Sequence, residues 1–249
     1  MKTLQILTYN IHKGLSASGL LFKLHQLKEV LQQTQVDVVM LQEVVGDHKI
    51  QPLLRNGWPK ESQFEFLADN IWSHYSYGKN AVSGIGNHGN AILSRYPIIK
   101  SENINISTNK LESRGLLHAV IQPEDAEHPI HLLNVHLNLL HGGRVLQAQK
   151  ITERVKSHIE HHESLVLAGD FNDWGQKMTQ ELNQQLELNE AHKMVHGCYG
   201  KSFPSFWPVL SLDRVYIRKL EVLKAQVMSG RPWNQLSDHL PLLVTLKYN

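Results

Sequence analysis

The strongest constraint on the fold is a strand–helix–strand pattern that occurs twice along the chain. In the first copy, β-type apolar runs at residues 4–11 and 36–43 flank a segment with helical periodicity. In the second copy, runs at residues 130–138 and 164–170 flank another helical segment. Repeated units of this kind are typical of α/β proteins, in which helices cover the faces of a sheet. We therefore expect an α/β fold.

Each of these runs carries polar residues at its end, and the spacing is nearly the same in the two copies. Asn10 and Glu43 are 33 positions apart, and His136 and Asp170 are 34 positions apart. Open α/β folds bind ligands beyond the ends of their strands. The pattern therefore predicts that these side chains contribute to one site.

The two helical segments each have an apolar face. Apolar residues three and four positions apart are typical of a helix that packs on other structure along one side. In the first segment these residues are Leu20, Leu21, Leu24, Leu27, Val30 and Leu31. In the second segment they are Val145, Ala148, Ile151, Val155 and Ile159.

Further short strand candidates lie outside the two copies. Residues 89–98 and 113–121 lie between them, and residues 211–217 and 240–246 follow them, with Gly-, Pro- and Asn-rich turns as separators. No linker-like or low-complexity tract divides the chain, and 249 residues suit one α/β domain. We expect a single domain over residues 1–249, with two sheets between helices.

The composition excludes several classes of protein. Hydrophobic residues make up 41% of the chain and charged residues 19%, as in ordinary globular proteins. The formal charge is +2, and the basic residues are dispersed, so the sequence has no concentrated charge for long duplex nucleic acid. The one cysteine, Cys198, indicates a reducing compartment. The opening residues resemble a strand rather than a signal peptide, and no apolar run of about 18 residues occurs. We expect a cytoplasmic protein.

The polar residues near strand ends suit the binding of a hard cation and the hydrolysis of a phosphate ester. Oxygen ligands without cysteine favour Mg²⁺ or Mn²⁺, and no histidine spacing matches a zinc motif. A divalent ion neutralises phosphoryl oxygens while a histidine removes a proton from water. The candidate residues are Asn10, Glu43, His136, Asn138, Asp170, Asn172, Asp213, Asp238 and His239.

Each catalytic candidate has a chemical role that suits its side chain. Asp213 can orient His239 as the general base, in the manner of a catalytic triad. Asp170 and Asn172, two positions apart, would flank the attacking water and a phosphate oxygen. His136 would donate a hydrogen bond to the phosphate or protonate the leaving group. The alternative for His136 is a core histidine between apolar neighbours.

A set of sequence motifs also resembles the motifs of a known protein family. In chain order they are TYNI (8–11), LQEV (41–44), GNAILSRYPI (89–98), NVHL (134–137), GDFND (169–173), LDRVY (212–216) and SDH (237–239). Together they resemble the motifs of the endonuclease/exonuclease/phosphatase superfamily, the deoxyribonuclease I-like group that includes AP endonucleases, sphingomyelinases and inositol phosphatases. The resemblance covers nearly the whole chain. It implies a four-layer α/β sandwich, with two mixed β-sheets face to face and helices outside.

The resemblance also implies roles for individual residues. Asn10 and Glu43 match the family's metal site, with Glu43 as the principal ligand, and Asp238 lies beside the metal. Asp213 and His239 match the pair that activates water. The implied cofactor is Mg²⁺ or Mn²⁺.

Other matched positions concern the substrate. Asp170 and Asn172 match the residues that position the nucleophile and the phosphate. Arg114 and Asn138 fall where family members contact phosphate or hold loops, and an ion pair with a surface carboxylate is the alternative for Arg114. Asn90 is either part of the substrate site or a residue of a tight turn after a glycine.

Two departures from the motifs of AP endonucleases argue against cleavage at abasic sites. His136 matches a position that is histidine in sphingomyelinase-like and deoxyribonuclease I-like members, whereas AP endonucleases have a tyrosine there. The first motif continues as NIHKG, where AP endonucleases carry an additional aspartate. The motifs GNAILSRYPI and GDFNDW resemble a cytosolic bacterial branch of the superfamily.

The expected function is that of a divalent-metal-dependent phosphoesterase that hydrolyses a phosphodiester. A lipid-derived or small-molecule ester is favoured as substrate over nucleic acid, with a nuclease and a non-catalytic phosphate-binding module as the alternatives. The aromatic stretch at residues 202–210 either forms a substrate rim that stacks on bases or contacts lipid, or packs beneath a rigid loop. We favour packing, because large aromatic side chains dominate protein cores.

Overall fold

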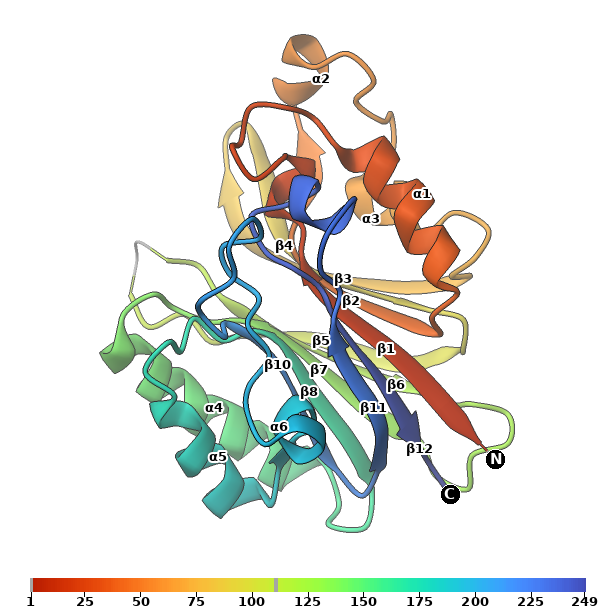
Figure 1. The fold of residues 1–249 in the computed structure, drawn as a ribbon, viewed down its shortest axis with the longest axis vertical. Helices are drawn as coiled ribbons and strands as arrows, with labels where there is room; N and C mark the ends of the chain where they lie inside the picture. The colour runs from red at the N-terminus through yellow and green to blue at the C-terminus, as the bar shows by residue number, and fades with distance from the viewer. Residues whose placement is uncertain (1, 110–111) are drawn as a thin grey trace.

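Two β-sheets packed face to face form the centre of the molecule. The computed structural model describes residues 2–109 and 112–249. Both sheets have six strands, and helices lie over their outer faces (Figure 1). Each sheet contains parallel and antiparallel strand pairs. The predicted four-layer α/β sandwich with two mixed sheets is therefore confirmed.

The first sheet combines strands from both ends of the chain. Its strands are β1 (Thr3–Asn10), β2 (Val38–His48), β3 (His74–Ser83), β4 (Gly86–Ser94), β11 (Glu221–Val227) and β12 (Leu242–Lys247). Their spatial order is β11-β12-β1-β2-β4-β3. The C-terminal strands thus return to pair with β1, and they bring the SDH motif that precedes β12 next to the N-terminal strand ends.

The second sheet is built from the middle of the chain. Its strands are β5 (Ile98–Asn105), β6 (Gly115–Ile121), β7 (Ile130–His136), β8 (Ser164–Asp170), β9 (Asn189–Glu190) and β10 (Asp213–Arg218). Their spatial order is β5-β6-β7-β8-β10-β9. The prediction of one strand over residues 89–98 is wrong at its end, because β4 stops at Ser94. The chain crosses between the sheets there, and Pro97 precedes β5.

The longer helices pack on the outer face of one sheet or the other. They are α1 (Leu24–Thr34), α4 (His141–His158) and α5 (Lys177–Leu186). Shorter elements are η1 (His12–Gly14), α2 (Gln51–Leu54), α3 (Gln63–Ala68), α6 (Ala191–His196) and η2 (Trp233–Gln235). No helix among the described residues is long and apolar enough to cross a membrane.

Both faces of the central strands are buried, which explains their continuous apolar runs. In β1, Leu4 and Ile6 belong to the core between the sheets, whereas Leu7 and Tyr9 belong to the core that also contains residues of α1. The corresponding outer core of the second sheet contains residues of α4 and α5.

The repeated units fold as the sequence predicts, except that the strand expected over residues 36–43 continues to His48 as β2, so Glu43 lies within a strand and not at its end. β1 and β2 are parallel, as are β7 and β8, and Asn10 pairs with Gln42 while His136 pairs with Asp170. One part of the helix prediction is wrong. Leu20 and Leu21 are exposed because α1 begins only at residue 24. The preceding residues form η1 and a loop with Gly14 and Gly19 at positive φ.

A buried amide network joins the two sheets near the strand ends. Gln42 Nε2 donates to Asn134 Oδ1 at 2.7 Å across the interface. Asn134 Nδ2 in turn donates to the carbonyl oxygens of Leu41 and Ala91, at 2.9 and 2.8 Å. The Asn134 amide is thus satisfied at both its oxygen and its nitrogen, whereas Gln42 Oε1 is buried without a hydrogen-bond partner among the described residues. Satisfied buried hydrogen bonds make the packing of two elements specific. The network therefore fixes how the ends of the two sheets meet.

Candidate active site

The ends of the strands open onto a cleft of about 430 Å³. Its walls come from both sheets, because β1 of the first sheet and β7 and β8 of the second end beside it, and β2 contributes Glu43 from within the strand. The residues that the sequence predicted and that line the cleft are Asn10, Glu43, Arg114, His136, Asp170, Asn172, Asp238 and His239. Side chains far apart in the sequence therefore meet in one place.

His239 and Asp213 form a buried pair beside this cleft. His239 Nδ1 lies 2.8 Å from Asp213 Oδ2, and the ring of Phe203 packs against the imidazole. Because a carboxylate only accepts hydrogen bonds, Nδ1 carries the proton in this contact. The other nitrogen, Nε2, lies 3.7 Å from Asp170 Oδ2. This arrangement can orient an imidazole whose Nε2 exchanges a proton with water.

The pKa of His239 is raised to about 10. Burial of the ring lowers this pKa, but the negative charges of Asp213 and Asp170 outweigh that effect. Carboxylates on both sides of one imidazole favour its protonated form. An imidazolium cannot accept a proton, so a positive charge beside Asp170 is needed before His239 can act as a base at neutral pH.

Asp170 occupies the centre of the site. Its Oδ2 accepts a hydrogen bond from Asn10 Nδ2 at 3.1 Å and lies 3.6 Å from His136 Nε2. Its Oδ1 accepts the backbone N–H of Asn172 at 3.0 Å. The same Asn10 amide nitrogen lies 3.4 Å from Glu43 Oε1. Asn10 thus links the carboxylates contributed by the two sheets.

The backbone at Glu43 has an unusual conformation that follows from the pairing of β2. The register between β2 and β4 shifts between Leu41 and Val44, which makes Glu43 part of a β-bulge. Its φ is +56°, in the left-handed region. Bulges re-aim side chains and are common beside active sites. Here the Glu43 carboxylate lines the cleft and lies 3.9 Å from Lys13 Nζ.

The GDFND segment reaches the cleft through a sharp turn after β8. Gly169 has a φ of +139°, and a Cβ there would lie 2.0 Å from the Val135 carbonyl oxygen, so only glycine fits. Asn172 has a φ of +49°, and its Nδ2 donates to the Leu137 carbonyl at 3.0 Å. Asp173 turns away from the cleft and forms a buried ion pair with Arg214 at 3.3 Å. The turn therefore separates residues of the cleft from a structural carboxylate.

His136 and Arg114 complete the wall from the second sheet. Burial lowers the pKa of His136 to about 3, so its imidazole is neutral at ordinary pH. The ring lines the cleft, which excludes the alternative of a histidine enclosed by the core. Arg114 also lines the cleft, and its Nη2 lies 3.3 Å from Glu112 Oε1. Arg114 therefore forms the ion pair that the alternative predicted, and contact with a phosphate stays a prediction.

Oxygen donors on the Glu43 side of the cleft suit a hard cation. Glu43, Asp170 and Asp238 supply carboxylates. Asn10 turns its amide nitrogen toward Glu43 and Asp170, and its amide oxygen accepts the backbone N–H of His12 at 3.1 Å. Among the residues that the structure describes, the Glu43 carboxylate has only long contacts with Asn10 and Lys13, so its lone pairs are available to an ion. Such a set matches the ligand chemistry of Mg²⁺ and Mn²⁺.

A second group of side chains is also compact enough for an ion. Ligand atoms of Asp170, Asp213 and His239 all lie within 4.8 Å of one another, and the three residues are buried. An ion among them would have to replace the 2.8 Å hydrogen bond between Asp213 and His239. Binding on the Glu43 side leaves that pair intact.

Asn90 and Asn138 were predicted as substrate-binding residues, and the structure places both outside the residues that line the cleft. Asn90 lies within β4, which also excludes the tight turn, and its Nδ2 donates to the carbonyls of Gly115 and Asn134 between the sheets. Asn138 Nδ2 donates to Thr108 Oγ1 at 2.8 Å. These hydrogen bonds direct the amide groups of Asn90 and Asn138 toward neighbouring loops and strands.

The favoured interpretation of the aromatic stretch, packing beneath a loop, is wrong for its central residues. Phe203 and Leu210 form a β-bridge, and the turn between them leaves Phe206 and Trp207 exposed. Phe203 itself lines the cleft. Trp233 is buried against Tyr9, with ring centroids 5.9 Å apart.

Lys13, His88 and Trp174 line the cleft although the sequence analysis assigned them no role. Lys13 reaches it because η1 places residue 13 at a φ of +58° directly after β1. Its position three residues after Asn10 is the one sequence signal for it. His88 lies on β4 opposite Val45, and this pairing depends on the bulge in β2.

Comparisons with known proteins agree with the family that the sequence motifs indicate. A sequence profile of the endonuclease/exonuclease/phosphatase family matches residues 7–239. "Uncharacterized protein YbhP" of Escherichia coli strain K12 is 41% identical over 238 residues, which is 96% of this chain and 94% of YbhP.

Solved structures share the fold at low sequence identity. An endonuclease/exonuclease/phosphatase from Bacteroides vulgatus has a TM-score of 0.77 at 16% identity, with 100% of both chains covered. TDP2 of D. rerio, crystallised with a single-strand DNA product, has a TM-score of 0.75 at 17% identity, over 99% of this chain and 100% of that one. From the profile match over nearly its whole length, this chain belongs to the endonuclease/exonuclease/phosphatase family.

Proposed function

We propose that this protein is a phosphoesterase that depends on Mg²⁺ or Mn²⁺ and hydrolyses a phosphodiester with a water molecule activated by His239. Proteins of its family are hydrolases that act on phosphoester bonds. The convergence of a buried Asp213–His239 pair with the Glu43 carboxylate at a single cleft supports this most directly. A base and a cation site in contact with the same space are what hydrolysis of a phosphate ester requires.

The residues divide into three tasks. Glu43, with Asn10 and Asp238, holds the cation, whose charge neutralises the phosphoryl oxygens when it is bound. Asp213 orients His239, and Nε2 of His239 takes a proton from the attacking water. Residues of both sheets take part, so we assign the activity to the chain as one domain. The single cysteine favours a reducing compartment, and we propose a cytoplasmic location on that ground.

Three further side chains act on the phosphate and the water. Asp170 accepts a hydrogen bond from the attacking water. Asn172 holds the turn that positions Asp170. His136 is neutral and therefore has an N–H that can donate to a phosphate oxygen. Arg114 lines the same cleft and contributes positive charge to an anionic substrate.

A lipid-derived or small-molecule phosphodiester is the favoured substrate, and DNA or RNA is the alternative. The alternative is favoured by the exposed Phe206 and Trp207 near the cleft, because aromatic rings bind single-stranded bases by stacking. The structural neighbour TDP2 with its single-strand DNA product points the same way. The formal charge of only +2 argues against a nucleic-acid substrate. Binding to a nucleic-acid backbone weakens steeply with salt, so salt dependence separates the two substrates.

The test is hydrolysis of bis-p-nitrophenyl phosphate with Mg²⁺ or Mn²⁺. We expect EDTA to abolish turnover and His239→Ala to reduce kcat by about 10²- to 10⁴-fold, the usual contribution of a general base. Glu43→Gln should also lose activity, through loss of cation binding. The matched control is Glu124→Gln, an exposed glutamate away from the cleft. Wild-type turnover in His239→Ala or Glu43→Gln would contradict the assigned mechanism, and a protein inactive on every ester would be a phosphate-binding module.

A further inference from the structure

The end of the molecule that carries α2 exposes leucines on two adjoining segments. Leu20 and Leu21, in the loop before α1, are 77% and 60% exposed. Leu53 and Leu54, in α2, are 83% and 73% exposed. Single exposed leucines are common on soluble proteins, but a contiguous group indicates an interaction surface.

Direct contacts hold these two segments together. Phe22 stacks on Trp58 with ring centroids 5.0 Å apart. Arg55 Nη1 donates to the carbonyl of Leu20 at 3.4 Å. Figure 1 shows α2 at the upper end of the molecule with the loop after β1 close to it. The exposed leucines therefore share one end of the fold.

The hairpin between β3 and β4 adds further apolar side chains to this end. Val82 and Ile85 are 69% and 48% exposed. Lys49, next to α2, binds the hairpin through its backbone N–H to the Ile85 carbonyl at 2.8 Å and through Nζ to the Gly84 carbonyl at 3.0 Å. We call the combined surface the apolar tip. It consists of Leu20, Leu21, Leu53, Leu54, Val82 and Ile85.

The segments that form the apolar tip have a one-sided charge. Residues 11–28, 48–60 and 70–101 contain no Asp or Glu, although the whole chain has 23. The neighbouring Asp47 is offset by Lys79, whose Nζ lies 3.9 Å away. The Lys and Arg residues in the three segments are Lys13, Lys23, Lys28, Lys49, Arg55, Lys60, Lys79, Arg95 and Lys100. Lys49 and Arg55 contact the tip segments themselves and place positive charge beside the apolar side chains. Lys28 instead pairs with Asp69, and Arg95 and Lys100 lie beyond the opposite end of β4.

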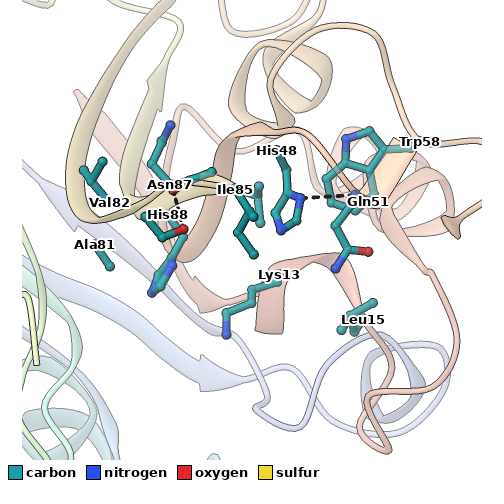
Figure 2. A pocket seen from close by; sticks show the side chains of 13 residues that line it. Lys13, Leu15, His48, Gln51, Trp58, Ala81, Val82, Ile85, Asn87 and His88 are labelled. Atoms are coloured by element: carbon teal, nitrogen blue, oxygen red, sulfur yellow. Dashed lines mark hydrogen bonds between the residues drawn. The ribbon is translucent and has the colours of Figure 1, made fainter. Parts of the chain in front are cut away.

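A pocket of about 300 Å³ lies between the apolar tip and the cleft. Trp58, Val82 and Ile85 line it on the side of the tip. Lys13 and His88 line both this pocket and the cleft, so the two spaces are adjacent. Figure 2 shows His88 and Trp58 on opposite sides of the pocket, with the ammonium group of Lys13 at its edge. A ligand at the apolar tip therefore has a short path to the catalytic residues.

We propose that the apolar tip docks on an anionic lipid surface and that the substrate is a phosphoester carried by a lipid, with its phosphate entering the cleft past Lys13 and His88. This rests on the phosphoesterase activity proposed above. Leucine side chains enter the boundary between headgroups and acyl chains, while Lys and Arg attract anionic headgroups. Leucines offer no aromatic face for stacking on bases, so a lipid surface fits this end better than single-stranded nucleic acid.

The test is sedimentation of the full-length chain with vesicles. We expect binding to phosphatidylcholine vesicles that contain phosphatidylglycerol and much weaker binding to phosphatidylcholine alone. Leu53→Ser/Leu54→Ser should reduce the bound fraction at least tenfold, and Lys49→Gln/Arg55→Gln should weaken binding about fivefold for each charge removed. The matched control is Met194→Ser/Val195→Ser, which changes two exposed apolar residues on the short helix α6.

Hydrolysis of soluble bis-p-nitrophenyl phosphate keeps the two proposals separate. Leu53→Ser/Leu54→Ser should retain wild-type turnover of this ester while it loses turnover of a phospholipid in vesicles. Wild-type sedimentation by the leucine variant would overturn the docking surface, as would no binding of the wild type to anionic vesicles. Tighter binding of a single-stranded oligonucleotide through the same leucines would also overturn it. If the wild-type protein instead binds vesicles but hydrolyses no ester, the phosphoesterase proposal fails while the docking surface stands.

Discussion

At the scale of single residues, the candidate site depends on strained backbone that carries polar side chains. Glu43 and Asn172 have φ values of +56° and +49°. Such conformations cost a non-glycine residue about 1–3 kcal/mol and persist only where the surrounding structure holds them. The bulge in β2 holds Glu43, and the hydrogen bond to the Leu137 carbonyl holds Asn172. These residues were identifiable from sequence motifs, but their conformations were not.

The variant Asp213→Asn tests the orientation of His239 without a large change in volume. The amide has no negative charge, so it neither raises the pKa of His239 nor reliably accepts the Nδ1 proton. We expect kcat on bis-p-nitrophenyl phosphate to fall by about 10²- to 10⁴-fold while binding of Mn²⁺, measured by calorimetry, is retained. If the variant instead lost Mn²⁺, the ion would be held by the Asp170–Asp213–His239 group.

At the scale of elements, a buried polar chain joins β6, β7 and α4 away from the cleft. Arg154 Nε donates to His118 Nδ1 at 3.1 Å, and His118 Nε2 lies 2.9 Å from His131 Nδ1. His131 Nε2 lies 3.3 Å from Glu163 Oε2. The Arg154 contact requires Nδ1 of His118 to be an acceptor, so the hydrogen bonds run in one direction from His118 to Glu163. This series of hydrogen bonds therefore requires a neutral His118.

These buried hydrogen bonds predict how the stability of the protein depends on pH. Burial, with the charges of His131 and Arg154, lowers the pKa of His118 to about 3, against an ordinary value of 6.5. The folded state disfavours protonated His118. The contribution of neutral His118 to the unfolding free energy is therefore complete above pH 6.5, and it is lost as the pH falls toward 3. At pH 5 the loss is about 2 kcal/mol of unfolding free energy. Urea unfolding between pH 7 and pH 5 measures it.

The control for this pH dependence uses two histidines. His118→Gln should reduce the fall in unfolding free energy between pH 7 and pH 5 by about 2 kcal/mol, whatever its stability at neutral pH, and the part of the fall due to His136 should remain. His128→Gln, at an exposed position, should leave the fall unchanged. An equal slope in wild type and His118→Gln would show that protonation of His118 does not drive the loss.

At the scale of the whole molecule, the cleft joins the two sheets, so an ion bound there stabilises their association. A ligand that binds only the folded state at 100 times its Kd stabilises it by about 2.7 kcal/mol. For a chain of this size we expect Mn²⁺ at that excess to raise Tm by about 5–10 °C. Thermal unfolding followed by circular dichroism measures the shift.

Glu43→Gln is the variant that connects this shift to the cleft. It should unfold near the metal-free wild type and gain little from Mn²⁺, whereas Glu124→Gln should respond like the wild type. An undiminished shift in Glu43→Gln would place the stabilising ion elsewhere in the protein.

The sequence alone determined the repeated units and the residues at their ends. Apolar periodicity and polar strand ends are local properties, and they identified β1, α4 and β8, as well as Glu43, Asp170 and His239. The order of the motifs along the chain was enough to predict the family, because motif order does not depend on knowing which segments touch.

Only the tertiary structure decided which polar residues line the cleft. The same local signals left Asn90 as a candidate for the site, yet strand pairing buries it between the sheets. They also left Lys13 without a role and placed Leu20 on a helix. Register, bulges and sheet packing arise from contacts between distant segments, and such contacts decide where a side chain points. For that reason, the apolar tip and its position beside the cleft emerge only from the folded chain.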